Sequence, residues 1–146
     1  MTRVAVTLHV GYGTFKPIRT DVVEEHVVDP EPYEITAGTA AAIALAREEG
    51  RRVIAVGTTT TRTLEDAAVR GEGIVRPGRA QAEIFIHPGF RYQVIDGLLT
   101  NFHLPESSLL MLVSAFAGRE RVLAAYEEAV QERYRFYSYG DAMLVI

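Results

Sequence analysis

No cysteine occurs among the 146 residues of the chain. This absence excludes a disulfide framework, a thiolate metal site and a thiol nucleophile. No apolar run approaches the roughly 20 residues that a membrane helix needs, and residues 1–3 lead into a short alternating segment that does not resemble a signal peptide. We therefore expect a cytoplasmic protein with no membrane contact.

Several chemical motifs are also missing. The chain has no Gly-Lys-Ser/Thr phosphate loop, no three-glycine dinucleotide fingerprint and no nucleophile elbow, which disfavours those nucleotide sites and Ser-His-Asp chemistry. The histidines show no paired ligand spacing, so we expect no metal site. They stand at positions 9, 26, 87 and 103.

The composition indicates a globular chain. With 48% apolar residues and a net charge of -4, it can bury a core and stay soluble as a single domain, residues 1–146. Residues 21–34 hold six acids and no Lys or Arg, whereas residues 62–91 hold five arginines against four acids. Any nucleic-acid surface must therefore be local, and residues 62–91 are the candidate region.

Strand-like and helix-like segments alternate along the chain, which predicts the α/β class with a parallel or mixed sheet flanked by helices. Residues 58–70 are expected to be a loop entering a helix, with Glu65 and Asp66 early in it. Pro105 is expected to open a helix that Gly118 ends. The expected strands are 4–10, 52–57 and 141–146, the expected helices are 36–50, 106–118 and 119–134, and residues 83–89 and 92–102 are expected to be β-rich.

Ligands of such sheets bind at the carboxyl ends of the strands, so the loops there are the candidate sites. Residues 8–15 carry Gly11 and Gly13, which serve either a ligand or a tight turn. Residues 57–65 offer threonine hydroxyls, helix N-terminal amides and Arg62 to an anion or a ribose. Residues 100–108 place many polar groups at a strand end, although a satisfied core histidine and a serine cap are the structural alternatives there.

Four blocks in these regions resemble one known family. They read LHVGYGTFKPI, VGTTTTRTLE, DGLLTNFHLPESSLLMLVSAFAG and YRFYSYGDAML, in this order along the chain. They are similar to the S-adenosylmethionine:tRNA ribosyltransferase-isomerases of queuosine biosynthesis, from about Val4 to the last residue. Ser108 stands where threonine is expected and His87 where an aromatic residue is common. Family members are more than twice as long, so the chain resembles only their C-terminal part, without their β-barrel domain and the first part of their α/β domain.

The resemblance implies an enzyme that uses S-adenosylmethionine as a ribosyl donor, as a co-substrate and not as a cofactor. The implied acceptor is 7-aminomethyl-7-deazaguanine at the tRNA wobble position, and the products are epoxyqueuosine-tRNA, adenine and methionine. A sulfonium acidifies the neighbouring C5' protons, so the path needs a base, an acid for departing adenine, and groups that hold ribose and methionine. No metal is required.

Site residues are expected where the chain matches the family's blocks. His103 is the first acid–base candidate, because an ordinary histidine pKa of about 6.5 lets it take and give protons near neutrality, and His9 is the second. Asn101 and Ser107 are expected to orient substrate hydroxyls. The other expected substrate-binding residues are Thr58, Thr59 and Arg62 for the methionine carboxylate or a tRNA phosphate, Glu65 and Asp96 for an ammonium or a base edge, and Tyr139 and Asp141 for stacking and hydrogen bonding. The structural alternative for Glu65 is that it only forms an ion pair with Arg62, three residues away on the helix.

Two other functions stay open at this point. The chain can be a non-catalytic tRNA-binding module that uses residues 62–91, or a different nucleotide-binding enzyme on a similar scaffold. Binding of S-adenosylmethionine without tRNA separates these from the transferase. The 146-residue chain alone is expected to be inactive and to self-associate through an incomplete sheet edge.

Overall fold

The computed structural model describes residues 1–15, 17–18, 20 and 22–146, and it contains two three-stranded sheets. The first has the order β1-β2-β4 and is antiparallel, with Thr7 opposite Glu34 and Tyr33 opposite Ala80. Its strands are β1 (Thr7–Leu8), β2 (Glu31–Ile35) and β4 (Gly78–Ala82).

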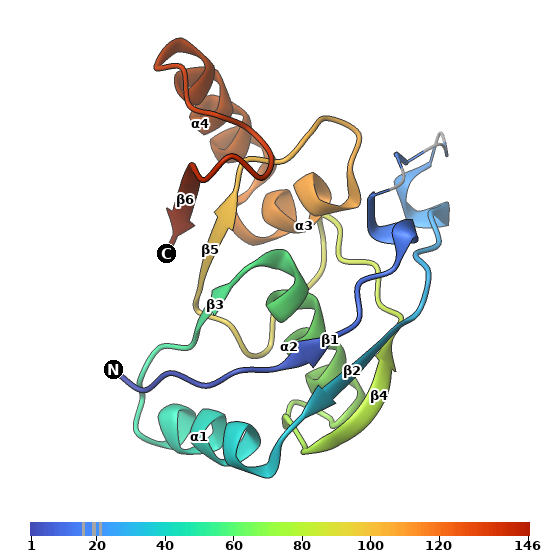
Figure 1. The fold of residues 1–146 in the computed structure, drawn as a ribbon, viewed down its shortest axis with the longest axis vertical. Helices are drawn as coiled ribbons and strands as arrows, with labels where there is room; N and C mark the ends of the chain where they lie inside the picture. Colours follow the sequence, from blue (N-terminus) through green and yellow to red (C-terminus); the bar gives the residue numbers. More distant parts are fainter. Residues whose placement is uncertain (16, 19, 21) are drawn as a thin grey trace.

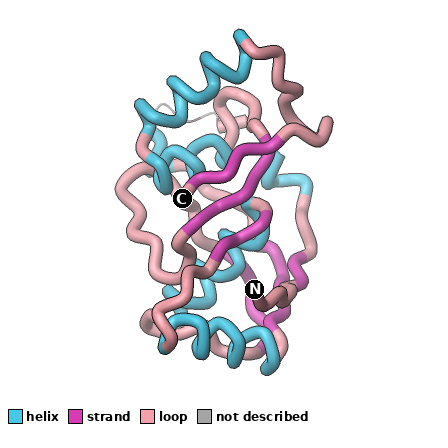
Figure 2. The backbone as a smooth tube through the Cα atoms, turned by 90° about the vertical axis from the view of Figure 1, so that its left-hand side faces the viewer, coloured by secondary structure: helices cyan, strands magenta, loops and turns pink. Residues whose placement is uncertain are grey.

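The second sheet is mixed, with the order β3-β5-β6. Strands β3 (Ile54–Val56) and β5 (Gly97–Asn101) are parallel, and β6 (Ala142–Val145) runs antiparallel to β5. Helices lie against these sheets, as Figures 1 and 2 show. The predicted α/β class with a mixed sheet flanked by helices is therefore confirmed.

Helix α2 (Thr58–Arg70) lies at the centre of the molecule (Figure 1). It contacts β1 and β4 of the antiparallel sheet and β3 and β5 of the mixed sheet. Nine of its residues are buried, including Arg62, Glu65 and Asp66. A helix enclosed in this way has almost no solvent face, so its polar side chains must find partners inside the protein.

The other helices are α1 (Ala37–Glu48), α3 (Ser108–Ala117) and α4 (Arg119–Gln131), with short 3₁₀ turns η1 (Tyr12–Phe15) and η2 (Val23–Glu25). Helix α1 begins as expected, because the Thr36 hydroxyl accepts a hydrogen bond from the Thr39 amide. It stops before Gly50, whose φ is +65°. Helices α1 and α4 lie at opposite ends of the long axis (Figure 1).

Four expectations about elements are corrected. The first strand is two residues long, and residues 58–70 are helical from Thr58, so Glu65 and Asp66 are not in the first turn. Pro105 does not open α3, because Ser107 caps a helix that begins at Ser108. Strands β2 and β4 were not expected, and no strand is assigned to residues 83–96. Within the described part of the chain, no helix is long and apolar enough to span a membrane.

Candidate functional site

The expected site loops converge at one end of the mixed sheet. Strands β3 and β5 are parallel and end together, because Val56 lies opposite Leu99. The antiparallel strand β6 begins at the same end, where Asn101 lies opposite Ala142. The segments 57–59, 102–108 and 137–141 are therefore neighbours, although they lie far apart in the sequence.

Hydrogen bonds join two of these segments directly. The Asn101 side-chain amide donates to the Asp141 carbonyl at 3.3 Å, and the Tyr137 amide donates to the Phe102 carbonyl at 2.7 Å. The two blocks with the sequences TNFHLP and SYGDAM thus meet in space. Asp141 is also held by Arg135, which donates its amide and its guanidinium to the carboxylate. These bonds lower the pKa of the Asp141 carboxyl.

The start of α2 offers free hydrogen-bonding groups. Gly57, with φ +91°, precedes the helix and supplies no side-chain cap. The hydroxyls of Thr60, Thr61 and Thr63 each donate to a carbonyl four residues earlier. Thr58 and Thr59 make no side-chain hydrogen bond to any described residue and line a cavity together with the helix N-terminus. This arrangement suits a carboxylate, a phosphate or a hydroxyl group.

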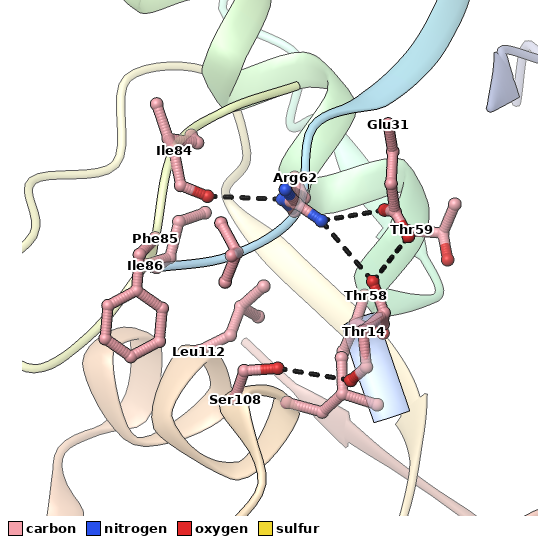
Figure 3. Close-up of a pocket in the computed structure, with 12 residues that line it drawn as sticks. Thr14, Glu31, Thr58, Thr59, Arg62, Ile84, Phe85, Ile86, Ser108 and Leu112 are labelled. Atoms are coloured by element: carbon pink, nitrogen blue, oxygen red, sulfur yellow. Dashed lines mark hydrogen bonds and ion pairs between the residues drawn. The ribbon is translucent and has the colours of Figure 1, made fainter. Parts of the chain in front are cut away.

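That cavity, about 20 Å³ in volume, lies between α2, α3 and η1 (Figure 3). It has room for about one water, whereas small-molecule sites commonly enclose roughly 300 Å³ or more. In this conformation the cavity is therefore too small to enclose a small molecule. The walls are Thr14, Val28, Glu31, Thr58, Thr59, Arg62, Ile84, Phe85, Ile86, Ser108, Leu109 and Leu112.

Arg62 is buried and all of its donors are occupied. A guanidinium has five N–H donors, and each of the five has an acceptor here. The acceptors are Glu31 Oε2 at 2.7 Å, the carbonyls of Ala82 at 2.8 Å, Asp29 at 3.0 Å and Ile84 at 3.2 Å, and Thr14 Oγ1 at 3.5 Å. Burial lowers the pKa of Arg62, and the charge of Glu31 opposes that effect. In this arrangement Arg62 braces the wall of the cavity, and it has no donor left for a substrate.

Glu31 is a functional candidate that the sequence did not reveal. It is 2% exposed, and its second carboxylate oxygen accepts from the Gly11 amide at 2.7 Å and the Thr14 hydroxyl at 2.5 Å. Glu31 thus ties the glycine-containing loop to the central helix (Figure 3). The sequence shows Glu31 only as one of six acidic residues in segment 21–34, and nothing in that pattern distinguishes it from the other five.

Glu65 and Asp96 are engaged elsewhere. Glu65 is fully buried and accepts from the amides of Gln93, Val94 and Ile95 at 2.7–3.1 Å. It makes no ion pair with Arg62. Asp96 precedes β5 and accepts from the Val53 amide at 2.8 Å, at the opposite end of the strands from Asn101. The structure does not bring these two carboxylates to the cavity.

His103 is 7% exposed and hydrogen-bonded on two sides. Its Nε2 lies 2.9 Å from the Thr100 hydroxyl, and its backbone amide donates to the Tyr126 hydroxyl at 2.8 Å. Burial lowers the pKa of His103 to about 4. At this pKa the ring is neutral at pH 7, with one N–H and one nitrogen that can accept a proton, so in this conformation it differs from the ordinary histidine expected from the sequence.

The remaining candidates are distributed around this end of the molecule. His9 is exposed just beyond β1, and its backbone amide donates to the Pro32 carbonyl. Ser107 caps α3 by accepting from the Leu110 amide at 3.2 Å. Tyr139 is 70% exposed beside Asp141. Within the ranges that the structure describes, no three His, Asp or Glu side chains gather to hold a metal ion.

Known proteins resemble the chain along almost its whole length. The family profile described as "Queuosine biosynthesis protein" matches residues 1–145. The S-adenosylmethionine:tRNA ribosyltransferase-isomerase of Pelotomaculum thermopropionicum is 62% identical over 143 residues, which cover 98% of this chain and 42% of that protein. The protein of the same name from Heliobacterium modesticaldum is 60% identical over 142 residues, covering 97% and 41%.

A solved structure agrees with the sequence matches. The crystal structure of S-adenosylmethionine tRNA ribosyltransferase from Thermotoga maritima superposes with a TM-score of 0.71 at 47% identity, covering 80% of this chain and 41% of that one. The chain thus spans about two fifths of the length of the relatives it matches. Because the family profile matches nearly every residue, the chain belongs to the family of queuosine biosynthesis proteins.

Proposed function

We propose that this chain forms part of an S-adenosylmethionine:tRNA ribosyltransferase-isomerase. The enzyme would transfer and isomerise the ribosyl moiety of S-adenosylmethionine onto 7-aminomethyl-7-deazaguanine at the tRNA wobble position. The products would be epoxyqueuosine-tRNA, adenine and methionine, formed in the cytoplasm. S-adenosylmethionine is a co-substrate in this proposal, and no cofactor or metal takes part.

One observation carries the proposal: segments with the family's most specific sequences meet at one end of the mixed sheet. There the free hydroxyls of Thr58 and Thr59 and the α2 N-terminus lie at the end of β3. Asn101 and Asp141 are joined by a hydrogen bond at the end of β5. A donor with a carboxylate, a ribose and a base needs anion, hydroxyl and stacking partners, and all three kinds of group occur here.

The proposed roles follow from which groups remain free. Thr58, Thr59 and the first amides of α2 would hold the methionine carboxylate. Asn101 would orient a ribose hydroxyl, and Tyr139 is exposed enough to stack on a base. Arg62 is better suited to positioning the cavity wall, because its donors are already bonded.

The acid–base assignment depends on protonation. His103, neutral at pH 7, would accept a proton or share a hydrogen bond, and it would not act as an acid from its resting state. His9 is exposed and is the alternative proton donor for departing adenine.

The direct test measures donor binding and adenine release. In a full-length family member carrying this segment, we expect saturable binding of S-adenosylmethionine without tRNA and adenine release that requires tRNA. Thr58→Val with Thr59→Val should weaken donor binding, whereas Thr63→Val, which removes a hydroxyl bonded to the Thr59 carbonyl, is a matched control. Salt-sensitive tRNA binding without any donor binding would instead support the non-catalytic tRNA-binding module.

The 146-residue chain by itself is proposed to be inactive, because its cavity is far smaller than the donor. It is also proposed to self-associate through an incomplete sheet edge. The outer face of the mixed sheet adds an apolar surface that a second copy can cover, formed by Val56, Leu99, Leu144 and Ile146. Epoxyqueuosine formation by the pure chain would refute the first proposal, and a monomer in sedimentation would refute the second.

A further inference from the structure

A second concave surface lies at the other end of the mixed sheet. It has a volume of about 260 Å³ and includes Asp96, which immediately precedes β5. Strand β5 has five residues, so at about 3.3 Å per residue this surface is about 15 Å from the Asn101 end. The other residues that line it are Arg47, Gly50, Arg51, Arg52, Tyr92, Gln93, Val94 and Ile95.

The charge of this concave surface is positive, in a chain whose net charge is -4. Three of the residues that line it are arginines, and Asp96 is the one acid among them. One Asp96 oxygen already accepts from the Val53 amide. Arg52 has no partner among the described residues. Arg47 donates one N–H to the Gly73 carbonyl, which leaves most of its donors free.

The remaining arginine, Arg51, pairs with Glu49 through Nε. Both side chains of this pair are about half exposed, so the pair is worth roughly 0–1 kcal/mol and can rearrange. A cation near the C-terminus of α1 is favourable for the helix dipole, which accounts for Arg47 in the last turn. That effect does not account for Arg51 and Arg52, which lie beyond the helix.

The basic region expected from the sequence is largely neutralised by comparison. Of the five arginines between residues 62 and 91, Arg62 pairs with Glu31, Arg70 with Asp66 and Glu83, and Arg79 with Glu34. Arg62 is buried with every donor bonded, so it is not available to a nucleic acid. For the rest of residues 62–91 the expectation stays a prediction, and Arg52 is the arginine with no partner among the described residues of the hollow.

We propose that Arg47, Arg51 and Arg52 form a site for a backbone phosphate of the RNA substrate. The planar guanidinium group matches phosphate oxygens in pairs, and three of them around one hollow can surround a phosphodiester. A ligand confined to the Thr58–Asn101 end cannot reach this site about 15 Å away, whereas a polymer can occupy both. The identification of the polymer as tRNA rests on the proposed function. The match between the arginines and a phosphate is independent of that function.

The test compares two double variants with the same loss of charge. Arg51→Gln with Arg52→Gln removes charge from the site. Arg119→Gln with Arg121→Gln removes the same charge from exposed positions in the first turn of α4, which do not line the hollow. Binding of a fluorescent tRNA transcript is followed by anisotropy at several KCl concentrations, and thermal melts check that each variant is folded.

The site variant should bind tRNA about tenfold more weakly, and its salt slope should fall by about one for each phosphate that the variant no longer neutralises. The α4 variant should stay within about twofold of wild type, and Arg52→Lys should recover part of the affinity by keeping the charge. Equal losses in both double variants, or no tRNA binding by the wild-type chain, would overturn the proposal.

A second measurement separates RNA from a free anion. Inorganic phosphate is titrated while the Arg52 Nε–H signal is followed by NMR, and tRNA is then added. We expect tRNA to shift this signal at concentrations where inorganic phosphate does not. A saturable response to inorganic phosphate that tRNA leaves unchanged would assign the pocket to a small anion and overturn the RNA site. Normal adenine release and tRNA affinity in a full-length site variant would also reject the site while leaving the proposed function intact.

Discussion

The buried ion pair between Arg62 and Glu31 supports the sharpest stability prediction. Glu31 is 2% exposed, and one of its oxygens lies 2.7 Å from an Arg62 nitrogen. Glu31→Ala would leave the guanidinium charge buried beside a cavity. It would also remove the acceptor of the Gly11 amide and the Thr14 hydroxyl. We expect Glu31→Ala to destabilise the fold strongly.

The magnitude follows from burial. Removing one partner of a buried ion pair costs about 3–5 kcal/mol, because the remaining charge has lost its compensation. The matched control is Glu34→Ala, on the same strand. Glu34 pairs with Arg79 at 3.0 Å, but the two side chains are 46% and 82% exposed, so that change should cost less than about 1 kcal/mol.

Urea unfolding followed by circular dichroism measures both free energies of unfolding. Domains are stable by about 5–15 kcal/mol, so Glu31→Ala alone can unfold the chain, and Glu31→Gln serves as a milder variant that keeps one acceptor. The expected order of destabilisation is Glu34→Ala, then Glu31→Gln, then Glu31→Ala. If Glu31→Ala costs no more than Glu34→Ala, the ion pair does not brace the fold and our account of Arg62 is wrong.

Three further predictions concern a turn, a cap and a titration. Gly71→Ala should destabilise the fold by more than about 1 kcal/mol in thermal or urea unfolding, because a Cβ there would lie 2.1 Å from the Ile74 carbonyl oxygen. In the control, Gly38→Ala, the new Cβ meets nothing closer than 4.0 Å, so the change should be close to neutral. Equal effects of the two substitutions would contradict this account. Ser107→Ala should lower the free energy of unfolding by about 1 kcal/mol, because the Ser107 side chain caps α3, and Ser107→Asp should restore most of that loss. A loss of donor binding at unchanged stability would instead support a role in substrate binding. Because the pKa of His103 is lowered to about 4, the unfolded chain takes up a proton below about pH 6.5 that the native ring does not, so stability should fall by about 2 kcal/mol from pH 7 to pH 5. His103→Gln should lack that part of the pH dependence, and an unchanged pH profile in this variant would refute the lowered pKa.

The elements that the sequence predicted well are those fixed by local signals. Thr36 caps α1, and Gly118, with φ +88°, ends α3, and both effects act within a few residues. The amphipathic pattern of α4 and the final strand β6 were also found. Strand β4 was not predicted because its sequence, GRAQA, has no β-branched or aromatic residue. It pairs with β2 through long-range register alone.

Helix α2 shows why the site was harder to predict than the fold class. Four consecutive threonines have poor helix propensity and suggest a loop. Tertiary packing overrides that preference, because α2 fills the space between two sheets. The partners of Arg62 and Glu65 come from residues 14–31 and 82–95, and no local pattern connects such distant segments.

The polar residues of helix α2 serve two different purposes. Glu65 and Asp66 accept hydrogen bonds from the segments that surround the helix, and Arg62 donates hydrogen bonds to them. These charged side chains therefore hold the walls of the cavity together. Thr58 and Thr59, one turn earlier, make no side-chain hydrogen bond to a described residue. Neither hydroxyl is a buried group without a partner, so both reach solvent at the cavity, where a ligand can take the place of water in their hydrogen bonds. The charged residues of α2 thus build the walls, and its first turn leaves two hydroxyls free to bond a ligand.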